Sequence, residues 1–229
     1  MKYRFFEEII SPERMKRYLN ACGEDRRKSK VLYRYNLSLS GAMLKIISCF
    51  EVALRNMINR TMILSYGEDW LRDCCLPGGM FDSPKTAGSQ KRIFETYNKL
   101  KAKGEYTHTH LLSEMKFGIW KYMYTRPQYK ATGQILLNVF PLRPKSKPGL
   151  QIGNKYIYNE LDKVNRLRNR IAHHEPICFL VKQPVVSVSY ALQEYQRIKK
   201  LLSWMGIDDK SLLFGIDNIE SICEKILAI

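Results

Sequence analysis

Several features that would indicate a common functional class are scarce or absent in this sequence. The six cysteines include no CxxC pair, which argues against a zinc site and a disulfide framework. His108 and His110 are spaced like metal ligands, but no second pair of ligand residues matches them. No uninterrupted apolar run is long enough to span a membrane, and the first residues lack the apolar core of a signal peptide. We therefore expect a cytoplasmic protein without a cofactor, a metal site or a membrane partner.

Acidic residues are also scarce. The chain has 22 Asp and Glu against 38 Lys and Arg, which gives a net charge of +16. The basic residues are spread along the chain rather than gathered in a terminal tail, so the folded surface itself must be positive. Such a surface favours a polyanionic partner such as nucleic acid. A soluble basic protein with an unrelated task is the alternative that charge alone leaves open.

Helical periodicity dominates what the sequence does contain. Residues 31–66 include one glycine and no proline, and their apolar residues recur at helical spacing, so we expect a long central helix. Ser11, Pro12 and Glu13 are typical of a helix start. Further helices are predicted near 88–103, 111–124, 150–174, 185–204 and 217–227, with loops at 75–90 and 141–149. A short strand is an alternative for the valine-rich residues 185–189. The sequence therefore predicts an all-α helical bundle with extra helices and long loops, in one domain over residues 1–229.

The predicted helix at about 150–175 carries an arginine on its apolar side. Its buried stripe is expected to contain Ile157, Leu161, Val164, Leu167 and Ile171. Arg168 lies only about 40° from Val164 around the helix, and a buried guanidinium without an anion is unfavourable by several kcal/mol. Glu51, on an apolar face of the long helix with Arg55 one turn on, is a candidate partner. A buried salt bridge that only fixes helix register is the alternative.

The other side of the same helix carries polar residues that suit acid and base chemistry. Asn169 and His173 are one turn apart, and Pro176 disfavours helix at Glu175, so His173 and His174 are both expected in the last turn. Histidine is the side chain most suited to proton transfer near neutral pH. A plain polar helix end is the competing interpretation.

These residues resemble a known family. "RNRIAH", residues 168–173, fits the RNxxxH form of the motif of HEPN-domain ribonucleases, and "RNRIAHHEPI" is similar to the Abi-like, abortive-infection branch. Other segments occur in the order typical of that branch between about residues 10 and 180, namely "SPERMKRYL", "FEVALRN", "YGEDWL", "FGIW" and "NVFPLR". The resemblance implies a HEPN-like helical fold, a homodimer, metal-independent RNA cleavage and a role in antiphage defence or as a toxin.

When the motif residues of the family are matched to this sequence by position, the resemblance implies that Arg168, Asn169 and His173 are catalytic. It also implies that Glu51 is an upstream polar residue of the site. His174 and Arg170 are competing assignments, also one turn apart. Because Arg168 and His173 are about 140° apart around one helix, two copies in a dimer would complete a site more readily than one copy. The expected partner is RNA, as substrate or as a regulatory small noncoding RNA. The supporting residues that we expect to contact RNA are His174, Arg170, Arg55, Arg143, Lys145 and Lys147.

A protein with the same fold that binds RNA without cutting it is the alternative function. In that case the chain would form a complex with a structured small noncoding RNA. An intact Arg168 and His173 favour the enzyme over this alternative.

Overall fold

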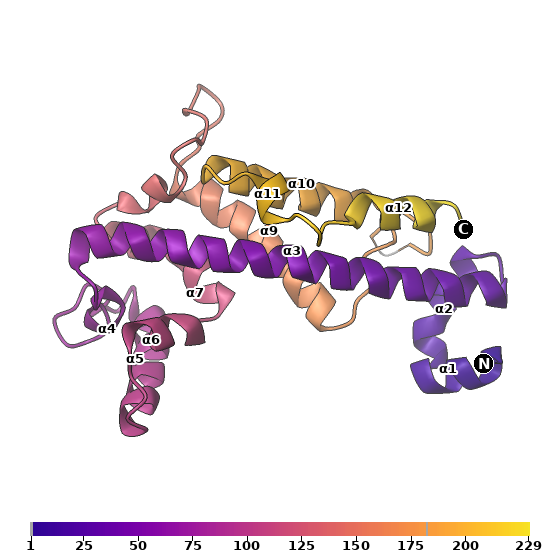
Figure 1. Ribbon diagram of the computed structural model, residues 1–229, viewed down its shortest axis with the longest axis horizontal. Coiled ribbons are helices and arrows are strands. Elements are labelled where there is room, and N and C mark those ends of the chain that lie inside the picture. The colour runs from indigo at the N-terminus through magenta and orange to yellow at the C-terminus, as the bar shows by residue number, and fades with distance from the viewer. Residues whose placement is uncertain (1, 182) are drawn as a thin grey trace. The chain divides into compact units, whose positions relative to one another are not determined.

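The computed structural model describes residues 2–181 and 183–229, and the regular elements in this part of the chain are helices (Figure 1). They are α1 (Tyr3–Ile10), α2 (Pro12–Ala21), α3 (Arg26–Tyr66), α4 (Trp70–Asp73), α5 (Ala87–Ala102), α6 (His108–Glu114), α7 (Phe117–Tyr122), α8 (Arg126–Ala131), the 3₁₀ helix η1 (Ile135–Val139), α9 (Asn154–Ala172), α10 (Ser189–Trp204), α11 (Asp209–Leu212) and α12 (Ile219–Leu227). Outside the helices, two isolated antiparallel bridges join Lys147 to Leu150 and Phe179 to Val186. The all-α prediction is confirmed, and the valine-rich segment contributes a single bridge rather than a strand.

One predicted helix is interrupted. We expected a continuous helix over 111–124, but α6 ends at Glu114 and α7 begins at Phe117, with Met115 and Lys116 extended between them. On one straight helix Leu111 and Trp120 would lie about 180° apart, yet both are buried. The break lets each short helix turn its own apolar side inward. α1 is a helix that we did not predict.

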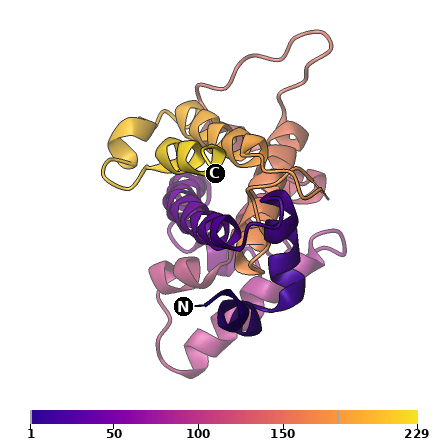
Figure 2. The ribbon, with the colours of Figure 1, turned by 90° about the vertical axis from the view of Figure 1, so that its right-hand side faces the viewer.

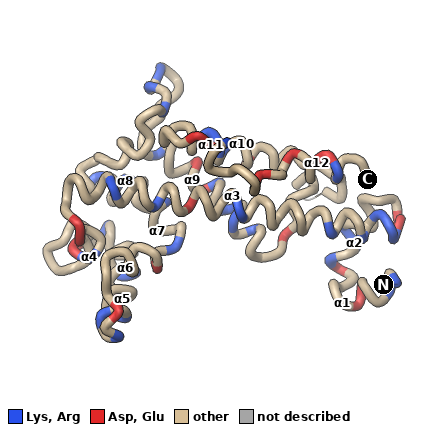
Figure 3. Tube along the Cα trace, in the orientation of Figure 1, with Lys and Arg blue, Asp and Glu red and all other residues tan. Residues whose placement is uncertain are grey.

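The chain divides into two compact units. Unit 1 comprises Met1–Cys49, Arg166–Lys200 and Asp209–Ile229, and unit 2 comprises Phe50–Asn165 and Leu201–Asp208. Lysine and arginine occur in both, as Figure 3 shows. One domain over residues 1–229 stays a prediction.

Unit 1 is organised around the segment that follows α9. Ser11 caps α2 as expected, its hydroxyl accepting the Arg14 N–H at 3.3 Å. α1 and α2 contact each other and are joined at a bend (Figure 2). The ring of Tyr18 on α2 packs edge-on against Phe179, with ring centroids 5.1 Å apart. The buried Asn36 on α3 accepts the Ile177 N–H at 2.9 Å. The segment after α9 is thus held by both α2 and α3; Lys182 within it lies outside the described residues.

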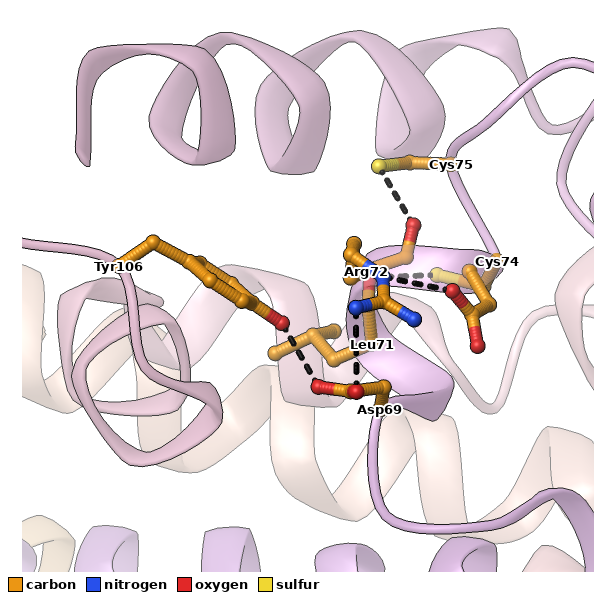
Figure 4. A network of polar contacts seen from close by, with 7 residues as sticks. Asp69, Leu71, Arg72, Cys74, Cys75 and Tyr106 are labelled. Atoms are coloured by element: carbon orange, nitrogen blue, oxygen red, sulfur yellow. Dashed lines mark hydrogen bonds and ion pairs between the residues drawn. The ribbon is translucent and has the colours of Figure 1, made fainter. Parts of the chain in front are cut away.

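In unit 2, α4, α5 and α6 pack against one another. Figure 4 shows a polar network beside α4, in which the Asp69 carboxylate accepts the Tyr106 hydroxyl at 2.8 Å and pairs with Arg72 at 3.0 Å. The thiols of Cys74 and Cys75 each donate to a backbone carbonyl at 3.1 Å. Burial raises the pKa of Cys75 to about 11. This thiol therefore stays protonated and poorly nucleophilic at neutral pH.

The long helix α3 is apolar over much of its length. By length and composition it is the one described helix that could cross a membrane. Core helices of globular proteins can have the same length and composition. Several apolar side chains of α3 are fully buried, including Leu32, Leu39, Met43, Leu54 and Ile58.

Candidate active site at the end of α9

The motif helix ends earlier than predicted. α9 runs from Asn154 to Ala172, so His173 and His174 follow the helix rather than forming its last turn. The Glu175 N–H donates to the Arg170 carbonyl at 2.8 Å, and the His174 N–H donates to the Ile171 carbonyl at 2.9 Å. His174 has φ 57°, in the left-handed region. This pair of hydrogen bonds around a left-handed residue is a Schellman cap, which stops the helix just before Pro176.

The motif side chains have different exposures. Asn169 and His173 are exposed, and the His173 N–H donates to the Asn169 carbonyl at 2.9 Å. Arg168 is half-buried. The predicted stripe around it is confirmed, since its five apolar members are buried. Among the described residues of unit 1, none forms a hydrogen bond or ion pair with the Arg168 side chain. Within the described part of unit 1, its guanidinium donors are therefore unused.

Glu51 and Arg55 lie on α3 in unit 2 and are half-buried. The Nε of Arg55 is buried and has no hydrogen-bond partner among the described residues. The pairing of Glu51 with Arg168 stays a prediction.

A groove of about 400 Å³ opens beside the two histidines, within unit 1. It is lined by Ser11, Glu13, Arg14, Arg17, Tyr18, His173, His174, Glu175 and Pro176. One side of the groove therefore comes from α2, which the sequence did not assign to the site. The Arg14 Nη1 donates to the His174 carbonyl at 2.7 Å, which leaves other donors of this exposed guanidinium free to meet a ligand in the groove.

The second arginine of α2 is tied to the protein itself. Arg17 donates from Nη2 to the carbonyls of Leu180 at 2.7 Å and Gln183 at 2.8 Å. Its guanidinium carbon lies 4.6 Å from the centroid of the Phe179 ring, a cation–π contact. Arg17 therefore holds the segment after α9 against α2, and Arg14 is the groove-lining arginine of α2 with donors to spare.

The side chain of Arg170 is also bound by other residues of the protein. It pairs with Glu175 at 3.3 Å, although its Nε does not make a well-aligned hydrogen bond, and its Nη2 donates to the Pro176 carbonyl at 2.7 Å. Its guanidinium carbon lies 4.6 Å from the Tyr190 ring centroid. These contacts brace the turn that carries His173 and His174.

The predicted basic loop belongs to unit 2. Arg143 is half-buried and donates from Nη1 to the carbonyls of Leu137 at 2.8 Å and Phe140 at 3.1 Å. Lys145 and Lys147 are exposed in a loop that projects away from the helices in both ribbon views (Figure 1, Figure 2). The two lysines are therefore more accessible to a ligand than Arg143.

Among residues 2–181 and 183–229, no three His, Cys, Asp or Glu side chains are grouped so that they could hold a metal ion. Comparison of the chain with protein-family models, with curated proteins and with solved structures finds no match.

Proposed function

We propose that the protein is a metal-independent endoribonuclease of the HEPN-like, abortive-infection type. The observation that carries the proposal is the groove of unit 1. There the exposed His173 and the guanidinium of Arg14, which has unused hydrogen-bond donors, line the same opening. An imidazole and a planar cation beside one opening suit phosphodiester chemistry.

The proposed reaction uses the RNA as its own nucleophile. The 2′-oxygen attacks the adjacent phosphorus while its proton passes to a base. The bond from phosphorus to the 5′-oxygen breaks, and that oxygen takes up a proton. The products are a 2′,3′-cyclic phosphate and a free 5′-hydroxyl. His173 acts as the base that accepts the 2′-hydroxyl proton or as the acid that protonates the 5′-oxygen. Arg168 or Arg14 donates hydrogen bonds to the phosphate oxygens, where negative charge develops. Asn169 orients the imidazole or the phosphate, and Glu51 orients Arg168.

We propose a homodimer as the active form. In one chain Arg168 is half-buried within the helix, whereas His173 is exposed beyond its end. A second copy would bring another His173 and another Arg168 to a shared phosphate. Sedimentation velocity on the active protein measures this state, and a monomer that still cleaves RNA contradicts it.

The histidine doublet offers a matched test of cleavage. The His173→Ala and His174→Asn chains are incubated with mixed RNA in EDTA. Asparagine tolerates the left-handed backbone at 174, so His174→Asn removes an imidazole but keeps the helix cap. We expect cleavage to fall about 10²- to 10⁴-fold in His173→Ala, the usual range for a lost acid or base, and to persist in His174→Asn.

Fragments that end in 2′,3′-cyclic phosphate identify the chemistry. Equal loss in both variants contradicts the assignment of His173. Tight retention of RNA without any cleavage by the unaltered chain would instead support the non-cleaving RNA-binding protein.

A further inference from the structure

A second opening, in unit 2, has a different chemical character. It has a volume of about 390 Å³ and lies where α8, the segment after it and the start of α9 meet. Its lining residues are Tyr124, Thr125, Arg126, Tyr129, Lys130, Gln134, Asn154, Lys155 and Tyr158. We call it the tyrosine pocket. None of these lining residues is acidic, and three are cationic.

The three cations have no anionic partner in the part of unit 2 that the structure describes. Arg126, Lys130 and Lys155 are exposed, and none forms an ion pair or a side-chain hydrogen bond among the described residues of unit 2. Asp162, one turn beyond Tyr158 on α9, pairs with the buried Lys121 at 2.8 Å. The charge of the pocket is therefore left for a ligand to balance.

The start of α9 adds to this positive potential. α9 has 19 residues and no acidic side chain in its first turn, where Lys155 lies instead. A cation is unfavourable at a helix N-terminus, because the helix dipole is positive there. The Asn154 side chain donates from Nδ2 to the Tyr124 carbonyl at 3.0 Å, which anchors this helix start at the pocket. The site has the electrostatic properties of an anion-binding site whose anion comes from outside the chain.

Tyrosine rings form the apolar part of the pocket. Tyr124 and Tyr129 are buried, and burial raises the pKa of both phenols, so these walls stay uncharged. Tyr158 is half-buried and keeps part of its ring accessible. The Lys121 Nζ lies 5.6 Å from the Tyr158 ring centroid, a cation–π contact that holds this ring in place. A fixed aromatic ring beside unpaired cations suits a planar base joined to a phosphate.

We propose that the tyrosine pocket binds one nucleotide unit, with the phosphate at Arg126, Lys130, Lys155 and the start of α9, and the base against Tyr158. The unit is either a free nucleotide or part of a single-stranded RNA. This site needs none of the residues proposed for cleavage. Inorganic phosphate or an acidic peptide would use the cations alone and gain nothing from Tyr158.

The test measures binding by fluorescence anisotropy, with a labelled six-nucleotide single-stranded RNA in EDTA. The full chain carries His173→Ala, so that cleavage cannot remove the probe. Lys130→Gln with Lys155→Gln removes two pocket cations. Lys99→Gln with Lys103→Gln is the matched control, since both are exposed lysines of unit 2 at the end of α5. Tyr158→Ala removes the ring, and Tyr158→Phe keeps its stacking surface.

We expect the pocket pair to weaken binding at least tenfold and the control pair less than twofold. The slope of log Kd against log salt concentration should fall by about 1.4 in the pocket pair, since each phosphate contact to a single strand contributes about 0.7. Tyr158→Ala should weaken binding about tenfold, within the range for a lost base stack, and Tyr158→Phe should bind within threefold of the parent. Competition by unlabelled AMP identifies a free nucleotide as a ligand, and competition by RNA alone identifies the strand.

Three results would overturn the proposal. Equal weakening by the pocket and control pairs means that net charge, not the pocket, binds RNA. Full binding by Tyr158→Ala means that the site takes an anion without a base. Competition by a polyglutamate peptide as strong as by RNA identifies a partner of a different class. Because the probe stays intact, none of these results depends on whether the chain cleaves RNA.

Discussion

The groove of unit 1 and the tyrosine pocket of unit 2 both contain cationic side chains, but these cations are used differently. In the groove, Arg14 and Arg17 donate to backbone carbonyls, and Glu13 and Glu175 lie in the same lining. In the tyrosine pocket, Lys130 and the other two cations have no such partners among the described residues of unit 2. A guanidinium with several partners inside the protein, such as that of Arg17, stabilises the fold. Arg14, with one such bond, and the unpartnered cations of the tyrosine pocket keep donors available to a ligand.

The largest expected effect concerns a cation that is fully committed to the fold. Lys121 is 6% exposed and pairs with Asp162 at 2.8 Å. Lys121→Met removes a charge that balances a mostly buried carboxylate, so we expect a loss of about 3 kcal/mol in the free energy of unfolding. Urea denaturation measures it. Lys130→Met, which removes an exposed and unpaired cation, should change stability by less than about 0.5 kcal/mol. Equal losses of stability in the two variants would show that the paired Lys121 and the unpaired Lys130 do not differ in their contribution to the fold.

A smaller loss is expected from the groove. Arg17→Ala removes the hydrogen bonds to Leu180 and Gln183 and the contact with the Phe179 ring. We expect stability to fall by about 2 kcal/mol in urea denaturation. Lys16→Ala, the neighbouring exposed lysine on α2, is the control and should be close to neutral. If both variants are neutral, Arg17 is as available to a ligand as the cations of the tyrosine pocket.

A gain in stability is expected at the start of α9. Lys155→Glu places an anion in the first helical turn, where the helix dipole favours it, and should raise the free energy of unfolding by about 0.5 kcal/mol. The same change should weaken RNA binding, because it reverses a charge of the tyrosine pocket. Thermal unfolding and the anisotropy titration measure the two effects on one sample. A less stable protein with unchanged binding would contradict the role given to Lys155.

The smallest expected effect is a pH dependence of stability that comes from His108, a neutral side chain of unit 2. The indole N–H of Trp70 donates to the Asn59 Oδ1, which also lies 2.8 Å from the His108 Nε2, so that Nε2 must carry a proton. The His108 Nδ1 is buried without a partner among the described residues. Burial lowers the pKa of His108 below the ordinary 6.5, and a second proton would place an unsatisfied N–H in this site.

Because the folded pKa of His108 is depressed, the unfolded chain binds more protons below about pH 6.5. The stability linked to His108 is therefore fully present above about pH 6.5, and it is lost as the pH falls below that value toward the lower pKa of the folded chain. Urea midpoints at pH 7.5 and pH 5.5 should differ less in His108→Gln than in the unaltered chain. An identical difference in both would show that His108 has the same pKa in the folded and the unfolded chain.

Local features of the fold could be predicted from the sequence. The Ser11 cap, the long α3 and the buried stripe of α9 follow from side chains that are close in sequence. The break between α6 and α7 was missed because it depends on which way Leu111 and Trp120 are buried, and periodicity within one segment does not define that direction.

The candidate site was predictable only along α9. Arg14 lies 160 residues before His174, and no local pattern relates the two. The expected contact of Arg143 with RNA stays a prediction, and its Nη1 donates to two carbonyls close in sequence. The tyrosine pocket brings α8 together with the start of α9, so its aromatic and basic residues could not be grouped from sequence alone.

The left-handed backbone of His174 affects how distant relatives should be sought. This position selects for residues that accept a positive φ, so glycine or asparagine can replace the histidine there with little strain. A search pattern that demands two consecutive histidines would discard such relatives. A pattern that fixes only the first histidine and admits His, Asn or Gly after it would retain them.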